Sequence, residues 1–251
     1  MKPISVQLYT VRELAKTDFI GVLKTIASIG YKGVEPAGLH GQKPQEIRKV
    51  LDDLGMVCSS AHGKLATKDN LAEVVETAQA LGYKHIVSGW KREDWTSLDG
   101  VKRAADAYRQ AGDLLKPHGL RMAYHNHWWE MNDIDGECAL ERFYKLAPDV
   151  TAQIDVYWAS NFGRVDVQAL IKRLAKRTPM LHLKDGPLVE GQPHTAVGAG
   201  KMNIPAVVRA ADPDTLRWLI VELDECATDM MQAVKDSYEY LTGEGLAKGN
   251  R

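Results

Sequence analysis

Eight short stretches of the chain predict β-strands, and in several of them hydrophobic and polar residues alternate with a period of two, as in strands with one buried face. The pattern is clearest where Leu120, Met122 and Tyr124 would face one way and the residues between them, with His125, the other. A longer stretch with the spacing of an amphipathic helix follows each of these segments. The predicted strands are 4–9, 33–36, 56–62, 84–90, 120–127, 150–158, 179–185 and 216–224.

Glycines mark the ends of several predicted helices. Gly30, Gly55 and Gly82 each follow the last apolar position of a helical stretch, as C-cap residues do. The chain from Gly245 onward is expected to form a frayed tail. The predicted helices are 18–29, 44–54, 70–81, 100–116, 137–146, 166–176 and 229–241, with one more that begins at Asn203 and has Pro205 in its first turn.

The strict alternation of strands and helices predicts a parallel sheet. Eight such units in 251 residues, with no break in composition, predict a single α/β domain over residues 1–251, the closed (β/α)8 TIM barrel. An open doubly wound sheet is the alternative, and it would normally carry a Gly-x-Gly-x-x-Gly turn after its first strand. Here the first strand runs into Thr10, Val11 and Arg12 instead, which favours the barrel.

Polar side chains gather at the carboxyl ends of the predicted strands, where the chemistry of such barrels lies. Asp155, His182 and Glu222 each lie between apolar neighbours on strands six, seven and eight. Carboxylates and imidazoles that point into an apolar interior need partners, because an unpaired buried charge is costly. Further polar groups at these strand ends are Gln7, Tyr9, Glu35, His62, His125, His127, Glu130 and Lys184.

A divalent cation is the simplest common partner for Asp155, His182 and Glu222. Carboxylates combined with an imidazole suit Mn²⁺, Mg²⁺, Co²⁺ or Zn²⁺. The alternative is a set of ordinary salt bridges and hydrogen bonds at the barrel mouth. Because all three residues share this pattern on consecutive strands, the sequence favours a metal site.

The remaining aromatic and histidine residues carry weaker signals. Trp128, Trp129 and Trp158 either stack on a sugar ring or simply cover the barrel mouth. Four histidines have no pattern of partners, and we interpret them as structural or solvated: His40, His85, His118 and His194.

The segment Gly198-x-Gly200 resembles part of a phosphate-binding loop. Thr195 stands where such a loop needs a glycine, and Met202 replaces its Ser or Thr. We therefore expect a flexible loop after strand seven, close to the active site.

The balance of charge excludes several classes of partner. Lys and Arg number 32 and Asp and Glu 33, so the net charge of −1 provides no basic field for nucleic acid. The 3 cysteines are odd in number and far apart, which argues against a disulfide framework and a thiolate zinc site. No apolar run suits a signal peptide or a membrane span. We expect a reduced cytoplasmic protein with no membrane partner, while a homo-oligomer stays open.

Several motifs, in this order, resemble the sugar phosphate isomerase/epimerase family of xylose isomerase-like barrels, and the resemblance covers nearly the whole chain. Relatives in that family include ketose 3-epimerases, inosose dehydratases, hydroxypyruvate isomerases, keto-glycoside epimerases and lyases, and endonuclease IV. The motifs are Ser5-Val6-Gln7-Leu8-Tyr9-Thr10-Val11-Arg12, Tyr124-His125-Asn126-His127-x-x-Glu130, Ile154-Asp155-Val156-Tyr157-Trp158, Leu181-His182-Leu183-Lys184-Asp185, Val197-Gly198-x-Gly200 and Val221-Glu222-Leu223-Asp224.

The resemblance implies one divalent metal ion held by residues from strands five to eight. Mn²⁺ is expected first, with Mg²⁺, Co²⁺ and Zn²⁺ as alternatives. Asp155, His182 and Glu222 match the family's ligands on strands six, seven and eight.

The fifth strand departs from the pattern of the ketose 3-epimerases, which have a glutamate within the strand itself. This chain has no glutamate there, so the fourth ligand is Glu130, His125 or His127, and we choose Glu130. The departure also weakens a reading as a free-sugar 3-epimerase, because those enzymes use two strand glutamates as acid and base.

The resemblance predicts a metal-dependent sugar isomerase or epimerase that acts on a keto-sugar or sugar derivative through a metal-stabilised enediolate. Glu222 or Glu130 would remove the proton. From their positions at strand ends, Lys184, His62 and His127 would bind hydroxyls and stabilise the developing oxyanion. Further substrate contacts are expected from His125, Gln7 and Trp158.

Two other functions share much of this pattern. A lyase or dehydratase acting on a keto-glycoside or inosose would take the same first step and then expel a β-substituent. A non-catalytic or DNA-directed barrel is the third reading, and the near-neutral charge and the single apparent ligand set argue against it.

Overall fold

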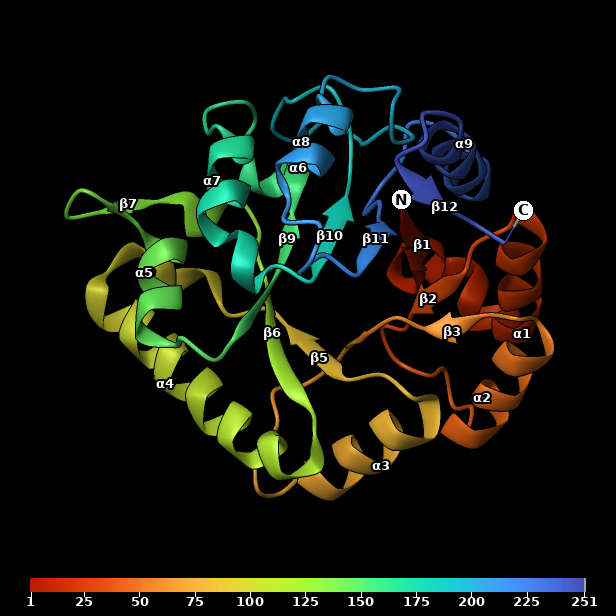
Figure 1. Ribbon diagram of the computed structural model, residues 1–251, viewed down its shortest axis with the longest axis horizontal. Coiled ribbons are helices and arrows are strands. Elements are labelled where there is room, and N and C mark those ends of the chain that lie inside the picture. Colours follow the sequence, from red (N-terminus) through yellow and green to blue (C-terminus); the bar gives the residue numbers. More distant parts are fainter. Residues whose placement is uncertain (251) are drawn as a thin grey trace.

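In a computed structural model, which describes residues 1–250, parallel strands form the wall of a barrel and helices surround it (Figure 1). The strands are β1 (Lys2–Gln7), β2 (Gly33–Glu35), β3 (Val57–Cys58), β4 (Ala61–His62), β5 (His85–Ser88), β6 (Arg121–His125), β7 (Asp133–Ile134), β8 (Glu137–Cys138), β9 (Thr151–Asp155), β10 (Met180–Leu183), β11 (Trp218–Val221) and β12 (Ala247–Lys248). The α-helices are α1 (Arg12–Ile29), α2 (Pro44–Asp53), α3 (Leu71–Leu81), α4 (Leu98–Leu115), α5 (Ala139–Leu146), α6 (Val156–Ala159), α7 (Val167–Leu174), α8 (Ile204–Ala210) and α9 (Met230–Gly243). Short 3-10 turns are η1 (Leu8–Val11), η2 (Arg92–Thr96), η3 (Lys116–His118), η4 (Trp129–Met131) and η5 (Ala175–Arg177).

The order of the strands confirms the predicted TIM barrel. Neighbours pair in the order β3, β2, β1, β11, β10, β9, β6, β5, β4, and all of these pairs are parallel. Because β3 and β4 are two pieces of one predicted strand, this order returns to its starting point. A parallel bridge between Ala37 and His62 joins the two sides, so the barrel is nearly closed.

The alternation of side chains separates the inside of the barrel from its outside. Met122 belongs to the large apolar core between the barrel wall and the helices, whereas its neighbour Ala123 belongs to a small separate cluster. That cluster fills part of the barrel interior with Val87, Ala123, Met180 and Ile220. Two residues further along three of these strands stand His125, His182 and Glu222. The period of two therefore turns these three side chains inward, above an apolar floor.

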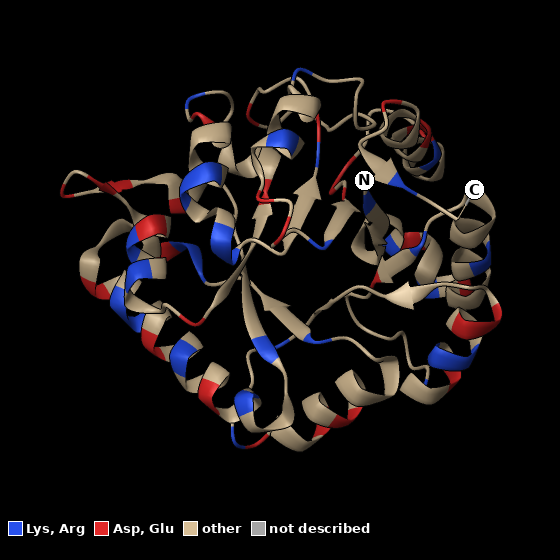
Figure 2. Cartoon of the chain, in the orientation of Figure 1, with Lys and Arg blue, Asp and Glu red and all other residues tan. Residues whose placement is uncertain are grey.

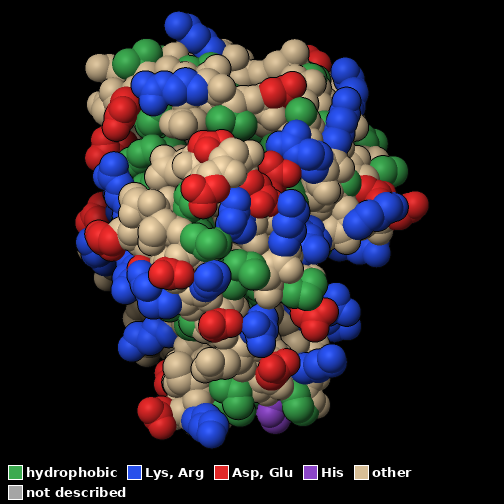
Figure 3. Space-filling view, turned by 90° about the vertical axis from the view of Figure 1, so that its left-hand side faces the viewer, with side chains coloured by type: hydrophobic (Ala, Val, Ile, Leu, Met, Phe, Trp, Pro, Cys, Tyr) green, Lys and Arg blue, Asp and Glu red, His purple; other side chains and the backbone are tan. Residues whose placement is uncertain are grey.

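Charged residues lie mainly on the outer helices, while the strands are mostly uncharged (Figure 2). On the face in Figure 3, acidic and basic side chains are interspersed and neither sign forms a continuous patch. This mixture agrees with the net charge of −1. Among the described residues, no helix combines the length and the apolar character that crossing a membrane requires.

Two predictions about elements are wrong. Residues 156–158, expected at the end of a strand, lie in helix α6, because the Oδ1 of Asp155 accepts a hydrogen bond from the Trp158 amide at 2.8 Å and so caps a helix. The tail after Gly245 does not fray. Leu246 and Ala247 are buried, and β12 pairs in parallel with β1, which places Ala247 and Lys248 against the first residues of the chain.

Candidate metal centre

Four inward-facing side chains meet at the carboxyl end of the barrel. His125, Asp155, His182 and Glu222 each offer one ligand atom, and these four atoms all lie within 4.8 Å of one another. They come from the ends of β6, β9 and β10 and from the residue after β11, which are neighbouring strands in the barrel. The structure thus brings together Asp155, His182 and Glu222, the three ligands that the sequence predicted. It adds His125 to this group.

The carboxylate of Asp155 is short of partners. Its Oδ1 caps α6, but its Oδ2 is buried without a hydrogen bond from any described residue and meets only the Lys184 ammonium, at 3.1 Å. Burial raises the pKa of Asp155, an effect that the positive charge of Lys184 opposes. A buried carboxylate with an oxygen within 4.8 Å of ligand atoms from two imidazoles and a second carboxylate fits a divalent cation.

The two histidines of the cluster differ in their surroundings. Burial, reinforced by the neighbouring His182, lowers the pKa of His125 well below its usual range, so its ring is neutral and has a lone pair to offer. Burial alone would also lower the pKa of His182, but the carboxylates of Glu35 and Glu222 raise it to about 10. His182 bonds Glu35 through Nε2 at 2.6 Å and Glu222 through Nδ1 at 2.9 Å.

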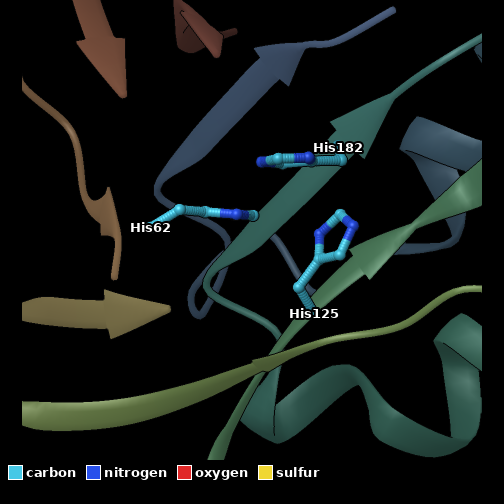
Figure 4. Close-up of side chains that lie close together, drawn as sticks. All are labelled: His62, His125 and His182. Atoms are coloured by element: carbon cyan, nitrogen blue, oxygen red, sulfur yellow. The ribbon is translucent and has the colours of Figure 1, made fainter. Parts of the chain in front are cut away.

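A third imidazole, His62, faces the same space (Figure 4). It comes from β4, on the opposite side of the barrel, and its ring stacks on that of His182 with 5.3 Å between centroids. His125 stands across both rings, 4.8 Å from His182 and 5.0 Å from His62. His62, His125 and His182 could also hold a metal together, although the Nε2 of His62 already contacts Gln153 at 2.7 Å.

Lys184 is fully buried beside the cluster. Its Nζ contacts Asp224 at 2.6 Å, Asp155 at 3.1 Å and Glu222 at 3.2 Å. Burial alone would lower the pKa of Lys184, but these three carboxylates raise it, so the side chain stays an ammonium. The Trp158 ring, 4.9 Å from Nζ, forms the adjoining wall.

Glu222 lies between two cations and is almost fully buried. Burial alone would raise its pKa, but Lys184 and His182 hold it well below the usual range. Glu222 is therefore an ionised carboxylate, the form in which it can accept a proton.

The structure does not bring Glu130 to the cluster. Its side chain is fully buried where η4 turns back, and its Oε1 accepts a hydrogen bond from the Tyr124 hydroxyl at 2.6 Å. Its Oε2 accepts one from the His127 amide at 2.8 Å. Glu130 thus holds the turn after β6 in place. These hydrogen bonds explain why a glutamate lies three residues after His127, and no metal is needed for that explanation.

The other predicted contacts surround the cluster. His127 stacks on Trp129 with 4.2 Å between centroids and lies 5.2 Å from His125. Gln7 reaches inward from β1, where its Nε2 donates to Glu35 at 2.8 Å. Trp158 packs against Trp128, with 4.8 Å between centroids, so the tryptophans form one aromatic wall at the mouth.

Sequence reasoning assigned no role to Glu35, Gln153 or Asp224. Glu35 is fully buried and contacts His182, Gln153 lies two residues before Asp155 on the same inward face of β9, and Asp224 binds Lys184. The period of two could have pointed to Gln153. The contacts of Glu35 cross the barrel from β2 to β10 and leave no local pattern.

The glycine motif after β10 surrounds a carboxylate of the protein itself. The Oδ2 of Asp185 accepts hydrogen bonds from the amides of Gly198 and Gly200 at 3.0 and 3.1 Å, and its Oδ1 from those of Gly186 and Met202 at 2.8 and 3.0 Å. Four backbone donors therefore fasten this loop to the end of β10, directly after Lys184.

These features define a TIM barrel with a buried cluster of metal-ligand type at its carboxyl end. The family model for the xylose isomerase-like TIM barrel matches residues 23–243, and the chain belongs to that family. No match was found among curated proteins.

Solved structures share the fold at low sequence identity. A sugar phosphate isomerase/epimerase from Parabacteroides distasonis is 22% identical with a TM-score of 0.77, over 98% of this chain and 96% of that one. The IOLI protein with a bound zinc atom is 14% identical with a TM-score of 0.72, over 97% and 99%. A xylose isomerase-like TIM barrel protein from Mycobacterium smegmatis in complex with magnesium is 14% identical with a TM-score of 0.70, over 98% of both chains.

Proposed function

We propose that the protein is a divalent-metal-dependent isomerase or epimerase that acts on a keto-sugar or sugar derivative. The observation that carries this proposal is the buried set of His125, Asp155, His182 and Glu222 at the carboxyl end of the barrel. In this proposal His125 takes the fourth ligand place that we had assigned to Glu130. The family and the sugar isomerase/epimerase with the same fold support the substrate class.

The donor set is two imidazoles and two carboxylates, which suits Zn²⁺, Mn²⁺ and Co²⁺ and is less typical of Mg²⁺. We expected Mn²⁺ from the resemblance. The zinc and magnesium of the two structural neighbours support a divalent cation without selecting Mn²⁺. Comparing the measured affinities of the protein for Zn²⁺, Mn²⁺, Co²⁺ and Mg²⁺ would therefore identify the metal.

A bound divalent cation would supply Lewis-acid polarisation of a substrate carbonyl. Glu222, ionised and turned inward, would remove the proton from the carbon next to that carbonyl and return it to a neighbouring carbon or to the other face. The Lys184 ammonium would donate a hydrogen bond to the oxygen on which negative charge develops. His62 and His127, both partly exposed at the mouth, would bind substrate hydroxyls.

A metal-dependent lyase or dehydratase is the second candidate. It is favoured by the position of Glu130, whose two oxygens are engaged by Tyr124 and His127 away from the cluster. Glu222 is then the one base proposed here, and a single base with the Lys184 ammonium as proton donor suffices for β-elimination from a keto-glycoside or inosose.

Proton NMR in D₂O distinguishes these functions. The protein is reloaded with Mn²⁺ or Zn²⁺ and incubated with ketoses, 3-keto-glycosides and inososes, and the substrates are examined after the metal is removed. Deuterium in a C–H position together with a new isomer supports the isomerase, whereas a vinylic or dicarbonyl product with loss of water or an aglycone supports the lyase.

Two variants connect the reaction to the site. Glu222→Gln should slow exchange by about 10²–10⁴-fold, the usual contribution of a general base. Glu225→Gln, an exposed neighbour three residues on, is the matched control and should react like the wild type. Equal rates in both variants, or no exchange with any substrate and metal, would contradict the proposed chemistry.

A further inference from the structure

Glu35 lies in the middle of the polar interior, although β2 supplies none of the four clustered residues. Its carboxylate is fully buried and is surrounded entirely by hydrogen-bond donors. These are Gln7 Nε2 at 2.8 Å, Ser60 Oγ at 2.5 Å, Gln153 Nε2 at 2.6 Å and His182 Nε2 at 2.6 Å.

The direction of these hydrogen bonds is fixed by what each group can do. An ionised carboxylate only accepts, so every partner of Glu35 must donate to it. The amide of Gln7 agrees with this direction, because its Oε1 already accepts from the Tyr9 backbone at 3.1 Å and its nitrogen is the atom left to face Glu35.

The direction of the hydrogen bond to Glu35 determines which nitrogen of His182 carries a hydrogen. Its Nε2 faces Glu35 and must carry a hydrogen. Its Nδ1 faces the ionised Glu222 and therefore also donates while no cation is bound. A cation can replace only this second hydrogen, because the one on Nε2 is held by Glu35, so Nδ1 is the nitrogen that would supply the lone pair. Nδ1 is also the atom on the side of the cluster, 2.9 Å from Glu222.

The hydrogen bond from Gln153 to Glu35 also determines which nitrogen of His125 carries a hydrogen. Since its Nε2 donates to Glu35, its Oε1 is the atom that faces Nδ1 of His125 at 3.0 Å and Nε2 of His62 at 2.7 Å. Nδ1 of His125 and Nε2 of His62 must therefore each donate a hydrogen bond to this oxygen. His125 then has its lone pair on Nε2.

We propose that Glu35 is the positioning residue of the metal centre: directly, and through Gln153, it determines which nitrogen of His182 and of His125 holds the cation. The cation binds Nδ1 of His182 and Nε2 of His125. This inference rests on the proposed metal site. Partners behind a metal-ligating histidine commonly fix its ring and its hydrogen in this way.

Nitrogen NMR of ¹⁵N-histidine-labelled protein with Zn²⁺ tests the inference, because Zn²⁺ is diamagnetic and the spectrum reports each ring nitrogen. In the wild type, Zn²⁺ should shift Nδ1 of His182 and Nε2 of His125, while the other nitrogen of each ring keeps its hydrogen. The reverse pattern in the wild type would overturn the inference without any substitution.

Two substitutions separate the direct path from the relayed one. Glu35→Gln should disturb both imidazoles, whereas Gln153→Ala should disturb His125 and leave His182 unchanged. Each should weaken Zn²⁺ binding, measured against a chelator of known affinity, by about 10–100-fold. Ser5→Ala is the matched control, because Ser5 is equally buried on β1 but bonds Ser59 and not Glu35.

The possible failures are distinct. If Glu35→Gln keeps the wild-type nitrogen pattern and a Zn²⁺ affinity within about threefold, the positioning role is wrong although the metal site stands. If Zn²⁺ shifts no nitrogen of His125 or His182 in the wild type, the proposed metal site itself is wrong.

Discussion

His125 and Glu130 lie five positions apart in the chain, but only His125 turns into the barrel. His125 ends β6 on the inward face, while Glu130 lies in η4 beyond it and binds Tyr124 and the His127 amide. The sequence does not reveal this difference, because a glutamate just after a strand can fold back in either direction. Only the turn through η4 decides which side chain reaches the cluster.

Substituting these two residues should therefore have opposite effects. His125→Ala removes one of the four proposed ligands and should weaken Zn²⁺ or Mn²⁺ binding by about 100-fold or more, since even partners behind a ligand contribute 10–100-fold. Glu130→Gln should leave affinity within about threefold and instead destabilise the fold by about 1–3 kcal/mol, because one of the two buried donors, the Tyr124 hydroxyl or the His127 amide, then faces an NH2 group in place of an oxygen. Calorimetry with each metal and urea unfolding measure the two quantities. Loss of affinity in Glu130→Gln alone would restore Glu130 as the ligand.

His85, which shows no pattern of partners in the sequence, supplies a pH dependence. It begins β5, pairs with Arg121 and lies at the opposite end of the strands from the candidate metal centre. Burial, followed by the charge of Arg121, lowers the pKa of His85 from 6.5 to about 4. The unfolded chain takes up a proton near pH 6.5, but the folded chain does so only near pH 4. Stability from the neutral ring is thus complete above pH 6.5 and is lost as the pH falls toward 4.

Urea unfolding at pH 7 and pH 5 measures this contribution. Between these values the wild type should lose about 1–2 kcal/mol more than His85→Gln, which has no imidazole to titrate. Other groups titrate in the same range, and the comparison cancels them. An identical pH dependence in the two proteins would show that His85 takes up its proton equally well in the folded state.

At the scale of elements, the loop after β10, which we expected to be flexible, is held by hydrogen bonds beside the candidate site. Asp185 holds four backbone amides of this loop, and Lys184 stands immediately before it. A Cβ atom at Gly200 would lie 2.1 Å from the Asp185 Oδ1 and 2.4 Å from the Gly186 amide nitrogen. This close approach, and not a phosphate, explains the glycine at this position.

Gly200→Ala should therefore lower the free energy of unfolding by about 1–3 kcal/mol, the usual cost of overpacking. Gly112→Ala is the control, because a Cβ there meets no atom within 4 Å and the site lies inside α4. It should be neutral or stabilise by up to about 1 kcal/mol, since alanine favours the helix. Unfolding in urea ranks the two variants, and equal stabilities would show that the loop can move away from Asp185.

The elements that the sequence predicts well are those in which one face is apolar. The period of two in β9, β10 and β11 identifies Asp155, His182 and Glu222 as inward side chains, because their neighbours pack outward. Helix α6 was missed because its bulky aromatic residues favour strands, whereas the cap formed by Asp155 depends on geometry. The network around Glu35 was missed because it joins β1, β2, β9 and β10, which meet only after the barrel closes.

At the scale of the whole molecule, closing the barrel concentrates charge in its interior. Lys184 and His182 face a larger number of carboxylates, supplied by Glu35, Asp155, Glu222 and Asp224. The unfolded chain has no such arrangement, so a cation that binds these groups binds the native state alone. Its binding free energy is then added to the stability of the fold.

Zn²⁺ or Mn²⁺ at about 100 times its dissociation constant should therefore raise the free energy of unfolding by about 2.7 kcal/mol. For a chain of this size the melting temperature should rise by about 5–10 °C, and EDTA should reverse the rise. Differential scanning calorimetry measures the shift, with His182→Ala as the variant that should show none. A shift of the same size in His182→Ala would place the stabilising metal elsewhere on the molecule, and no shift in the wild type would remove the link between the barrel's interior charge and a bound cation.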